Sequence, residues 1–88
     1  MTDRKLLELA AKAAGHDIPG IRWDDVAAEY VNWNPLTDDG DALRLAVSIE
    51  MLDISYSNED WDVCNHDGYA ATRRAIVRAA AAIGEAMP

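Results

Sequence analysis

The sequence predicts an α+β fold of the α/β/α-sandwich type, in which an antiparallel sheet of two hairpins packs against three amphipathic helices. Three observations predict it. Apolar residues recur at helical spacing in three segments, one near each end of the chain and one in the middle. The segments between them carry the alternation and turn residues that are typical of hairpins. Eighty-eight residues, half of them hydrophobic, suffice for one core, so residues 1–88 are expected to form a single domain.

The first helix is expected over residues 3–14. Thr2 can accept a hydrogen bond from a free backbone N–H at its start, and Asp3 suits the positive end of the helix dipole. Gly15 can end the helix, because glycine readily adopts the left-handed conformation that closes many helices. The apolar residues of this segment recur on one face: Leu6, Leu9, Ala10 and Ala13.

The segment from Ile18 to Val31 is expected to form the first hairpin, with its turn at Asp24 and Asp25. Pro19 restricts the first strand to a sheet edge or a late start, because proline has no backbone N–H to donate. The stretch DDVAAEYV also allows a second interpretation, two helical turns capped by Asp24. The sequence favours the hairpin and leaves both open.

The second helix is expected over about residues 39–49, within the stretch WNPLTDDGDALRLAV. Pro35 forces the preceding residue to be extended, so the helix begins after it. Thr37 or Asp38 can cap it, and the remaining acids of DDGD then meet free N–H groups in the first turn. The apolar residues again share one face: Ala42, Leu45, Ala46 and Ile49.

The second hairpin is expected from the alternating segment MLDISYS, a turn at SNED and a short returning strand, WDVCN. Asp67 then caps the last helix, which is expected from Tyr69 to about Ala86. An apolar stripe is expected along this helix at Tyr69, Thr72, Ile76, Ala80, Ile83 and Met87.

Acidity is the most informative bulk property. The chain has 16 Asp and Glu against 8 Lys and Arg, a net charge of −8. Thirteen of the acids lie within residues 17–67, where the only basic residues are Arg22 and Arg44. Such a field repels nucleic-acid backbones and attracts basic protein surfaces, so direct nucleic-acid binding is not expected. The alternative is that the acidity only keeps a small domain soluble.

The single cysteine, Cys64, allows no internal disulfide, which suits a reducing cytoplasm. The opening TDRKLLELAAKAAG is amphipathic, and no run of about 20 apolar residues is present. We therefore expect a soluble, intracellular protein without a membrane partner.

The acids of DDGD do not fit a metal loop. A calcium loop anchored on Gly40 would need acidic or amide residues where the chain has Pro35 and Thr37, and a glutamate where it has Ala46. We therefore interpret Asp38 and its neighbours as helix-start residues and expect no metal there.

A second polar group, Asp62, Cys64 and His66, would share one face of a strand, and His16 could be added to draw a zinc site. Zinc ligands usually come in pairs such as CxxC or HxxxH, which this chain lacks. A Cys–His nucleophile pair is also conceivable, but no oxyanion-hole motif accompanies it. We expect no catalytic residue, no cofactor and no enzyme activity.

Arginines and tryptophans offer two further groups. Arg74 and Arg78 are one turn apart on the last helix, beside Arg73, and could hold a phosphate or a carboxylate. The alternative, which we favour, is a solvated face or internal pairing with the surplus acids. Core packing is the default explanation for the three tryptophans, and Trp33 at the WNP corner is the one expected to be partly exposed.

Three blocks, TDRKLLELAAKAAG, WNPLTDDGDALRLAV and ATRRAIVRAAAAIGEAM, resemble the small phage proteins built on the phage ABA sandwich domain. They cover about half of the chain. Residues 16–32 and the CNHD turn match no pattern of that family. The resemblance implies a phage accessory protein with a sandwich fold, and it assigns no catalytic residue.

Together with the charge, the resemblance predicts a non-enzymatic inhibitor of host antiviral defence, of the anti-CRISPR kind, in the host cell cytoplasm. It would bind a basic surface of a host defence complex through acidic and aromatic residues, expected at Asp24, Asp25, Trp33, Asp38, Asp39, Glu59, Asp60 and Trp61. One alternative is a sponge that sequesters a nucleotide messenger with Arg73, Arg74, Arg78 and a tryptophan. Another is an accessory protein without a defence role. A homodimer stays open.

Overall fold

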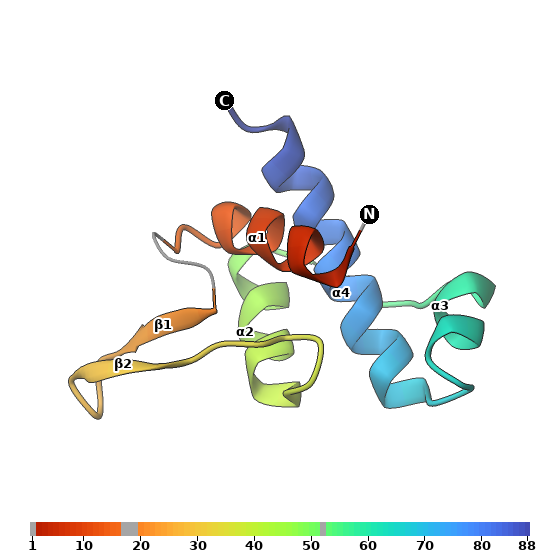
Figure 1. Ribbon diagram of the computed structural model, residues 1–88, viewed down its shortest axis with the longest axis horizontal. Coiled ribbons are helices and arrows are strands. Elements are labelled where there is room, and N and C mark those ends of the chain that lie inside the picture. The colour runs from red at the N-terminus through yellow and green to blue at the C-terminus, as the bar shows by residue number, and fades with distance from the viewer. Residues whose placement is uncertain (1, 17–19, 52) are drawn as a thin grey trace.

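The computed structural model describes residues 2–16, 20–51 and 53–88. They form four helices and one two-stranded antiparallel sheet (Figure 1). In chain order the elements are α1 (Asp3–Ala13), β1 (Ile21–Asp24), β2 (Glu29–Asn32), α2 (Asp39–Ser48), α3 (Asn58–Val63) and α4 (Gly68–Ala86). The mixed α+β class is confirmed. The expected three helices and two hairpins are wrong in detail, because one hairpin is replaced by α3.

Helix α1 begins and ends as its sequence predicts. The Thr2 side chain accepts a hydrogen bond from the Lys5 N–H at 3.2 Å. At the other end Gly15 has a φ of +80°, and the His16 N–H donates to the Ala11 carbonyl at 2.9 Å. This is the closing pattern that a left-handed glycine makes accessible at a helix end.

Helix α2 begins at the WNP corner, as expected. Of the two candidate caps, Asp38 is the one used, and its side chain accepts from the Asp41 N–H at 2.7 Å. Asp39 and Asp41 both lie in the first turn. The prediction that these acids start a helix is confirmed.

The first hairpin is also confirmed, and the helical alternative for this segment is wrong. Trp23 lies opposite Tyr30, and Asp24 lies opposite Glu29. The turn spans residues 25–28, and the Asp24 carboxylate stabilises it by accepting from the Val26 and Ala27 N–H groups at 2.9 and 3.3 Å. The expected start at Ile18 and the role of Pro19 lie outside the described residues. The hairpin projects from the helices at one end of the molecule (Figure 1).

The second predicted hairpin is wrong. Residues 53–57 form no strand, and Asn58–Val63, which includes most of the expected turn and returning strand, is helical. The cause is a reciprocal cap: the Ser57 side chain accepts from the Asp60 N–H, and the Asp60 carboxylate accepts from the Ser57 N–H. The letters SNED therefore start a helix.

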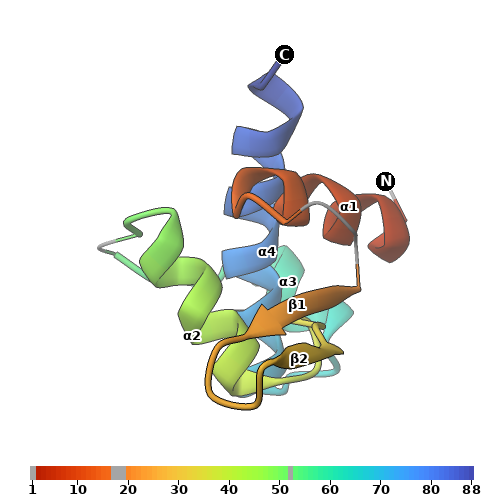
Figure 2. The same cartoon turned by 90° about the vertical axis from the view of Figure 1, so that its left-hand side faces the viewer.

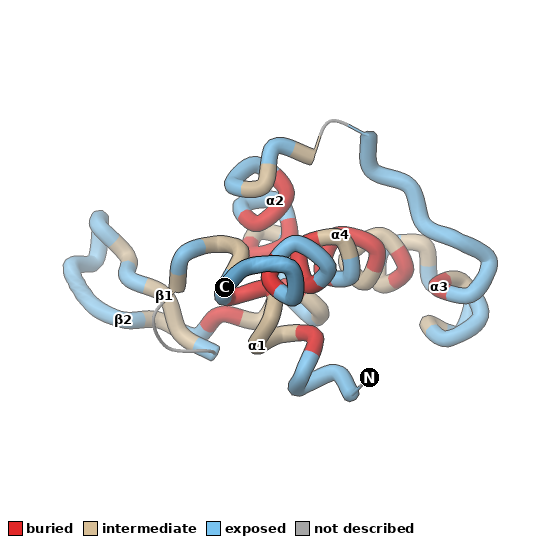
Figure 3. The backbone as a smooth tube through the Cα atoms, turned by 90° about the horizontal axis from the view of Figure 1, so that it is seen from above, coloured by how far each residue is buried: buried red, intermediate tan, exposed pale blue. Residues whose placement is uncertain are grey.

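Helix α4 is the axis on which α1, α2 and α3 pack, and it contains more buried residues than any other described element (Figure 3). Its expected stripe is only partly correct, because Tyr69, Ile83 and Met87 are exposed. The buried face instead contains mostly small residues: Ala71, Ala75, Ile76, Val77, Ala80, Ala81 and Gly84. Small side chains bring the neighbouring helices close to the α4 backbone. None of the helices in the described part of the chain is long and apolar enough to cross a membrane.

Candidate functional site

The predicted acidic residues do not form one surface. Asp24 and Asp25 lie on the projecting hairpin, whereas Glu59 and Asp60 lie on α3 at the opposite end of the molecule (Figures 1 and 2). Asp38 and Asp39 lie between them at the start of α2. Any single contact surface must therefore be built around one of these groups.

The hairpin carries residues that the sequence did not single out. Trp23 and Tyr30 lie opposite each other, with ring centroids 5.2 Å apart and planes at 76°. They are 51% and 63% exposed, although aromatic side chains of this size are normally covered. Val26 at the turn is almost fully exposed, and Glu29 adds a third carboxylate. We call Trp23, Asp24, Asp25, Val26, Glu29 and Tyr30 the hairpin surface.

Trp33, which was expected to be partly exposed, is instead buried with only 3% of its surface accessible. It belongs to the main core cluster, and its ring lies nearly perpendicular to that of His16, at a centroid distance of 4.6 Å. The WNP corner turns the chain from β2 into α2 against the core, so the tryptophan there points inward. Trp33 is a core residue and not a contact residue.

Asp41 ties the hairpin to α2. It is buried, and its carboxylate accepts from Arg44 at 2.6 Å, from the Asn34 N–H at 3.0 Å and from Arg22 at 3.3 Å. Burial alone would raise the pKa of Asp41, but the hydrogen bonds from Arg44, Asn34 and Arg22 lower it below its usual value. The charge of this carboxylate is therefore paired within the fold and is not available to a partner.

Asp60 is likewise internal, which corrects the expectation that it faces solvent. It is 2% exposed and accepts from the Arg78 guanidinium at 2.7 Å. Burial opposes its ionisation, yet hydrogen bonds from Arg78 and Ser57 bring the pKa of Asp60 below its usual value, and the same pair raises the pKa of Arg78. Glu59 beside it is exposed.

Trp61, the second aromatic residue predicted at the contact surface, is half-buried at the α3 end of the molecule. Its ring is nearly parallel to those of Tyr56 and His66, with centroid distances of 5.5 and 5.4 Å and interplanar angles of 13°. The indole is therefore already in contact with two rings of this chain. This arrangement leaves Trp61 less available to a partner than Trp23.

The three arginines of the alternative phosphate site face in different directions. Arg73 pairs with Asp39 at 2.6 Å, Arg74 with Asp3 at 3.0 Å, and Arg78 with Asp60 at 2.7 Å. The internal pairing favoured from the sequence is thus what the structure has. Arg73 also donates to the Leu36 carbonyl, so it links α4 to the WNP corner.

The residues that were considered as possible zinc ligands do not lie on a strand. His66 follows α3 and approaches the Asp62 carboxylate at 3.3 Å. Within residues 2–16, 20–51 and 53–88 no three His, Cys, Asp or Glu side chains are grouped as a metal site requires. His16 lies far along the chain, against Trp33.

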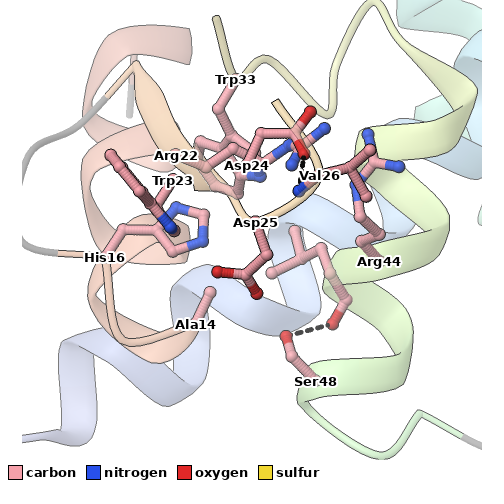
Figure 4. Close-up of a pocket in the computed structure, with 11 residues that line it drawn as sticks. Ala14, His16, Arg22, Trp23, Asp24, Asp25, Val26, Trp33, Arg44 and Ser48 are labelled. Atoms are coloured by element: carbon pink, nitrogen blue, oxygen red, sulfur yellow. Dashed lines mark hydrogen bonds between the residues drawn. The ribbon is translucent and has the colours of Figure 1, made fainter. Parts of the chain in front are cut away.

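A cleft of about 610 Å³ lies between the hairpin, the end of α1 and α2 (Figure 4). Its polar lining comprises His16, Arg22, Asp24, Asp25, Arg44 and Ser48, and Trp23 forms an aromatic wall. Burial lowers the pKa of His16, and nearby Arg22 lowers it further while Asp41 opposes the shift, so the imidazole is neutral at pH 7. The cleft is within the size range of small-ligand sites.

Comparison with protein-family models, with curated proteins and with solved structures finds no match for this chain. The resemblance to phage ABA sandwich proteins therefore stays a prediction.

Proposed function

We propose that this chain is a non-enzymatic binding protein that attaches to a basic protein surface through its hairpin surface. The observation that carries the proposal is the combination of three carboxylates with two exposed aromatic rings on an element that projects from the helical body. Aromatic side chains anchor many protein interfaces, and acidic neighbours select basic partners.

The distribution of ion pairs supports the choice of the hairpin. Every arginine of the chain pairs with a carboxylate, as shown for Arg4, Arg22, Arg44, Arg73, Arg74 and Arg78. Within the described residues, Asp24, Asp25 and Glu29 have no ion-pair partner. Their charge is thus directed to solvent and to any approaching molecule.

The projection of the hairpin favours a partner with a concave basic surface. Opposite charges steer such partners together and raise the association rate. The aromatic rings become buried when the complex forms, and their contacts slow its dissociation. A basic groove that normally holds nucleic acid fits both features. Occupation of that groove would block nucleic acid without any chemical step.

The biological form of the proposal is an inhibitor of host antiviral defence, of the anti-CRISPR kind, acting in the host cell cytoplasm. The sponge alternative has less support, because Arg73, Arg74 and Arg78 each face a carboxylate of this chain. A sandwich arrangement like that of the phage family is part of the same proposal.

The test begins with a tagged pull-down from host cells, with and without nuclease, to obtain a protein partner. Association of the purified partner is then measured between low and high salt for the wild type and for Asp24→Lys/Asp25→Lys/Glu29→Lys. The variant should associate at least about tenfold more slowly at low salt, with a flatter salt dependence. The control is Asp53→Lys, which changes an exposed acid that is remote from the hairpin in the sequence. It measures the effect of one such charge reversal outside the hairpin surface. Unchanged rate and salt slope in the triple variant would refute the proposal.

A further inference from the structure

The cleft beside the hairpin has an uneven distribution of charge. Arg22 and Arg44 line it, but both donate to the same buried carboxylate, Asp41. Asp24 and Asp25 also line it, and neither forms an ion pair with a described residue. With Asp41 counted against the two arginines, the cleft has a surplus of negative charge. Three carboxylates thus face two guanidinium groups, a surplus of one negative charge, and an anionic ligand would meet two carboxylates that form no ion pair with a described residue.

The carboxylate of Asp25 is open to an external donor. It forms no hydrogen bond or ion pair with the described residues, and it is exposed on the turn. In Figure 4 its carboxylate points from the hairpin into the cleft, between His16 on one side and Ser48 on the other. Asp24 uses one oxygen to accept from Val26 and Ala27, and its other oxygen has no such partner.

Two further residues of the cleft bear on the kind of ligand that it can hold. The Nδ1 atom of His16 is buried without a hydrogen-bond partner in the described part of the chain. Trp23 forms a half-exposed aromatic wall of the same cleft. The aromatic wall together with the open carboxylates of Asp24 and Asp25 suits a planar cation that is rich in N–H groups. A guanidinium has five N–H donors in one plane and stacks on indole rings, whereas an ammonium is a compact point charge.

We propose that this cleft binds the guanidinium group of an arginine carried by the basic partner. The arginine would stack on Trp23 and donate to Asp25 and Asp24, with the imidazole of His16 at the base of the cleft. This inference rests on the proposed function, and it adds the identity of the partner side chain. It also accounts for two hairpin acids that Arg22 and Arg44 leave unpaired, since both arginines donate to Asp41 instead.

The probe is a pair of blocked tripeptides, acetyl-Gly-Arg-Gly-amide and acetyl-Gly-Lys-Gly-amide, which have the same charge. Each is titrated into the isotopically labelled protein, and the three tryptophan indole N–H signals are followed by NMR. The arginine peptide should bind about fivefold more tightly than the lysine peptide, because stacking of a guanidinium on indole adds about 1 kcal/mol. The shift should appear at Trp23 and be absent at Trp61 on α3.

Asp25→Asn should weaken binding of the arginine peptide by about fivefold, and Asp53→Asn, with the same charge change outside the cleft, by less than about twofold. Equal affinities for the two peptides, or equal losses in the two variants, would overturn the inference. That result would leave the proposed function intact if the triple hairpin variant still slows association with the protein partner. Conversely, arginine binding in the cleft together with unchanged partner association would refute the proposed function alone.

Discussion

Replacement of Gly84 by alanine should destabilise the protein, although alanine is the better helix former. Gly84 is buried in α4, where that helix packs on α1. A Cβ atom at this position would lie 2.0 Å from the Leu9 carbonyl oxygen and 2.8 Å from its carbonyl carbon. Both atoms belong to the backbone of α1, so neither can rotate away. The two helices must move apart to admit one methyl group.

The expected cost follows from two opposing terms. Overpacking of a close contact costs about 1–3 kcal/mol, and a rigid backbone obstacle places this case at the upper end. A separation of about 1 Å also weakens the van der Waals contacts on either side of the clash. Removal of glycine from a helix returns about 1 kcal/mol. The net loss should be about 2 kcal/mol, which lowers Tm by about 8–16 °C in a domain of this size.

The assay is urea unfolding followed by circular dichroism, with Gly40→Ala as the matched control. A Cβ at Gly40 in α2 would meet only the side-chain ends of Asp38 and Arg44, at 3.2 to 3.5 Å. That variant should be unchanged or up to about 1 kcal/mol more stable. If Gly84→Ala were as stable as the wild type, with the same dependence on urea, the close approach of α1 and α4 would be wrong.

Three other outcomes are expected. Because Asp41 and Asp60 have pKa values below those of an unfolded chain, the unfolding free energy should fall as pH drops from about 5 to about 2, and Asp60→Asn should flatten this fall when urea unfolding is repeated across that range. Trp33→Ala should cost about 3–5 kcal/mol by the same assay, whereas Trp23→Ala should change stability by less than about 0.5 kcal/mol and weaken partner binding instead. Ser57→Ala should cost about 1 kcal/mol and lower the helical circular dichroism signal, because it removes the cap of α3; an unchanged signal and stability would contradict that role.

The parts of the fold that the sequence predicts are those whose determinants are local. Thr2, Asp38 and Asp67 cap three helices as expected, since an N-cap acts on N–H groups only two or three residues away. The hairpin turn at Asp24 is local for the same reason. The second hairpin was predicted from the alternation in MLDISYS, and this prediction is wrong. The cap formed by Ser57 is an equally local signal, and it could have identified the helix that replaces the hairpin.

The sequence alone does not predict which of these residues are buried. Trp33 and Trp23 are ten residues apart and have the same side chain, yet one is core and the other is exposed. The difference depends on how the WNP corner meets α1 and α2, and no local pattern encodes this. Asp60 was expected at the surface for a similar reason, because its partner, Arg78, comes from another helix. The cleft also combines residues from three separate segments.

The pairing of charges distinguishes the acids that stabilise the fold from the acids that are available for binding. Asp41 and Asp60 are the two buried acids among the described residues, and the arginines that pair with them are thereby withdrawn from any external ligand. Loss of such a partner leaves a buried charge, so substitutions there should act on folding. The hairpin acids have the opposite properties, since they are outside the core and pair with no described basic group. A change at Asp25 should therefore leave the unfolding free energy nearly constant, and any effect on partner association can be assigned to the interface.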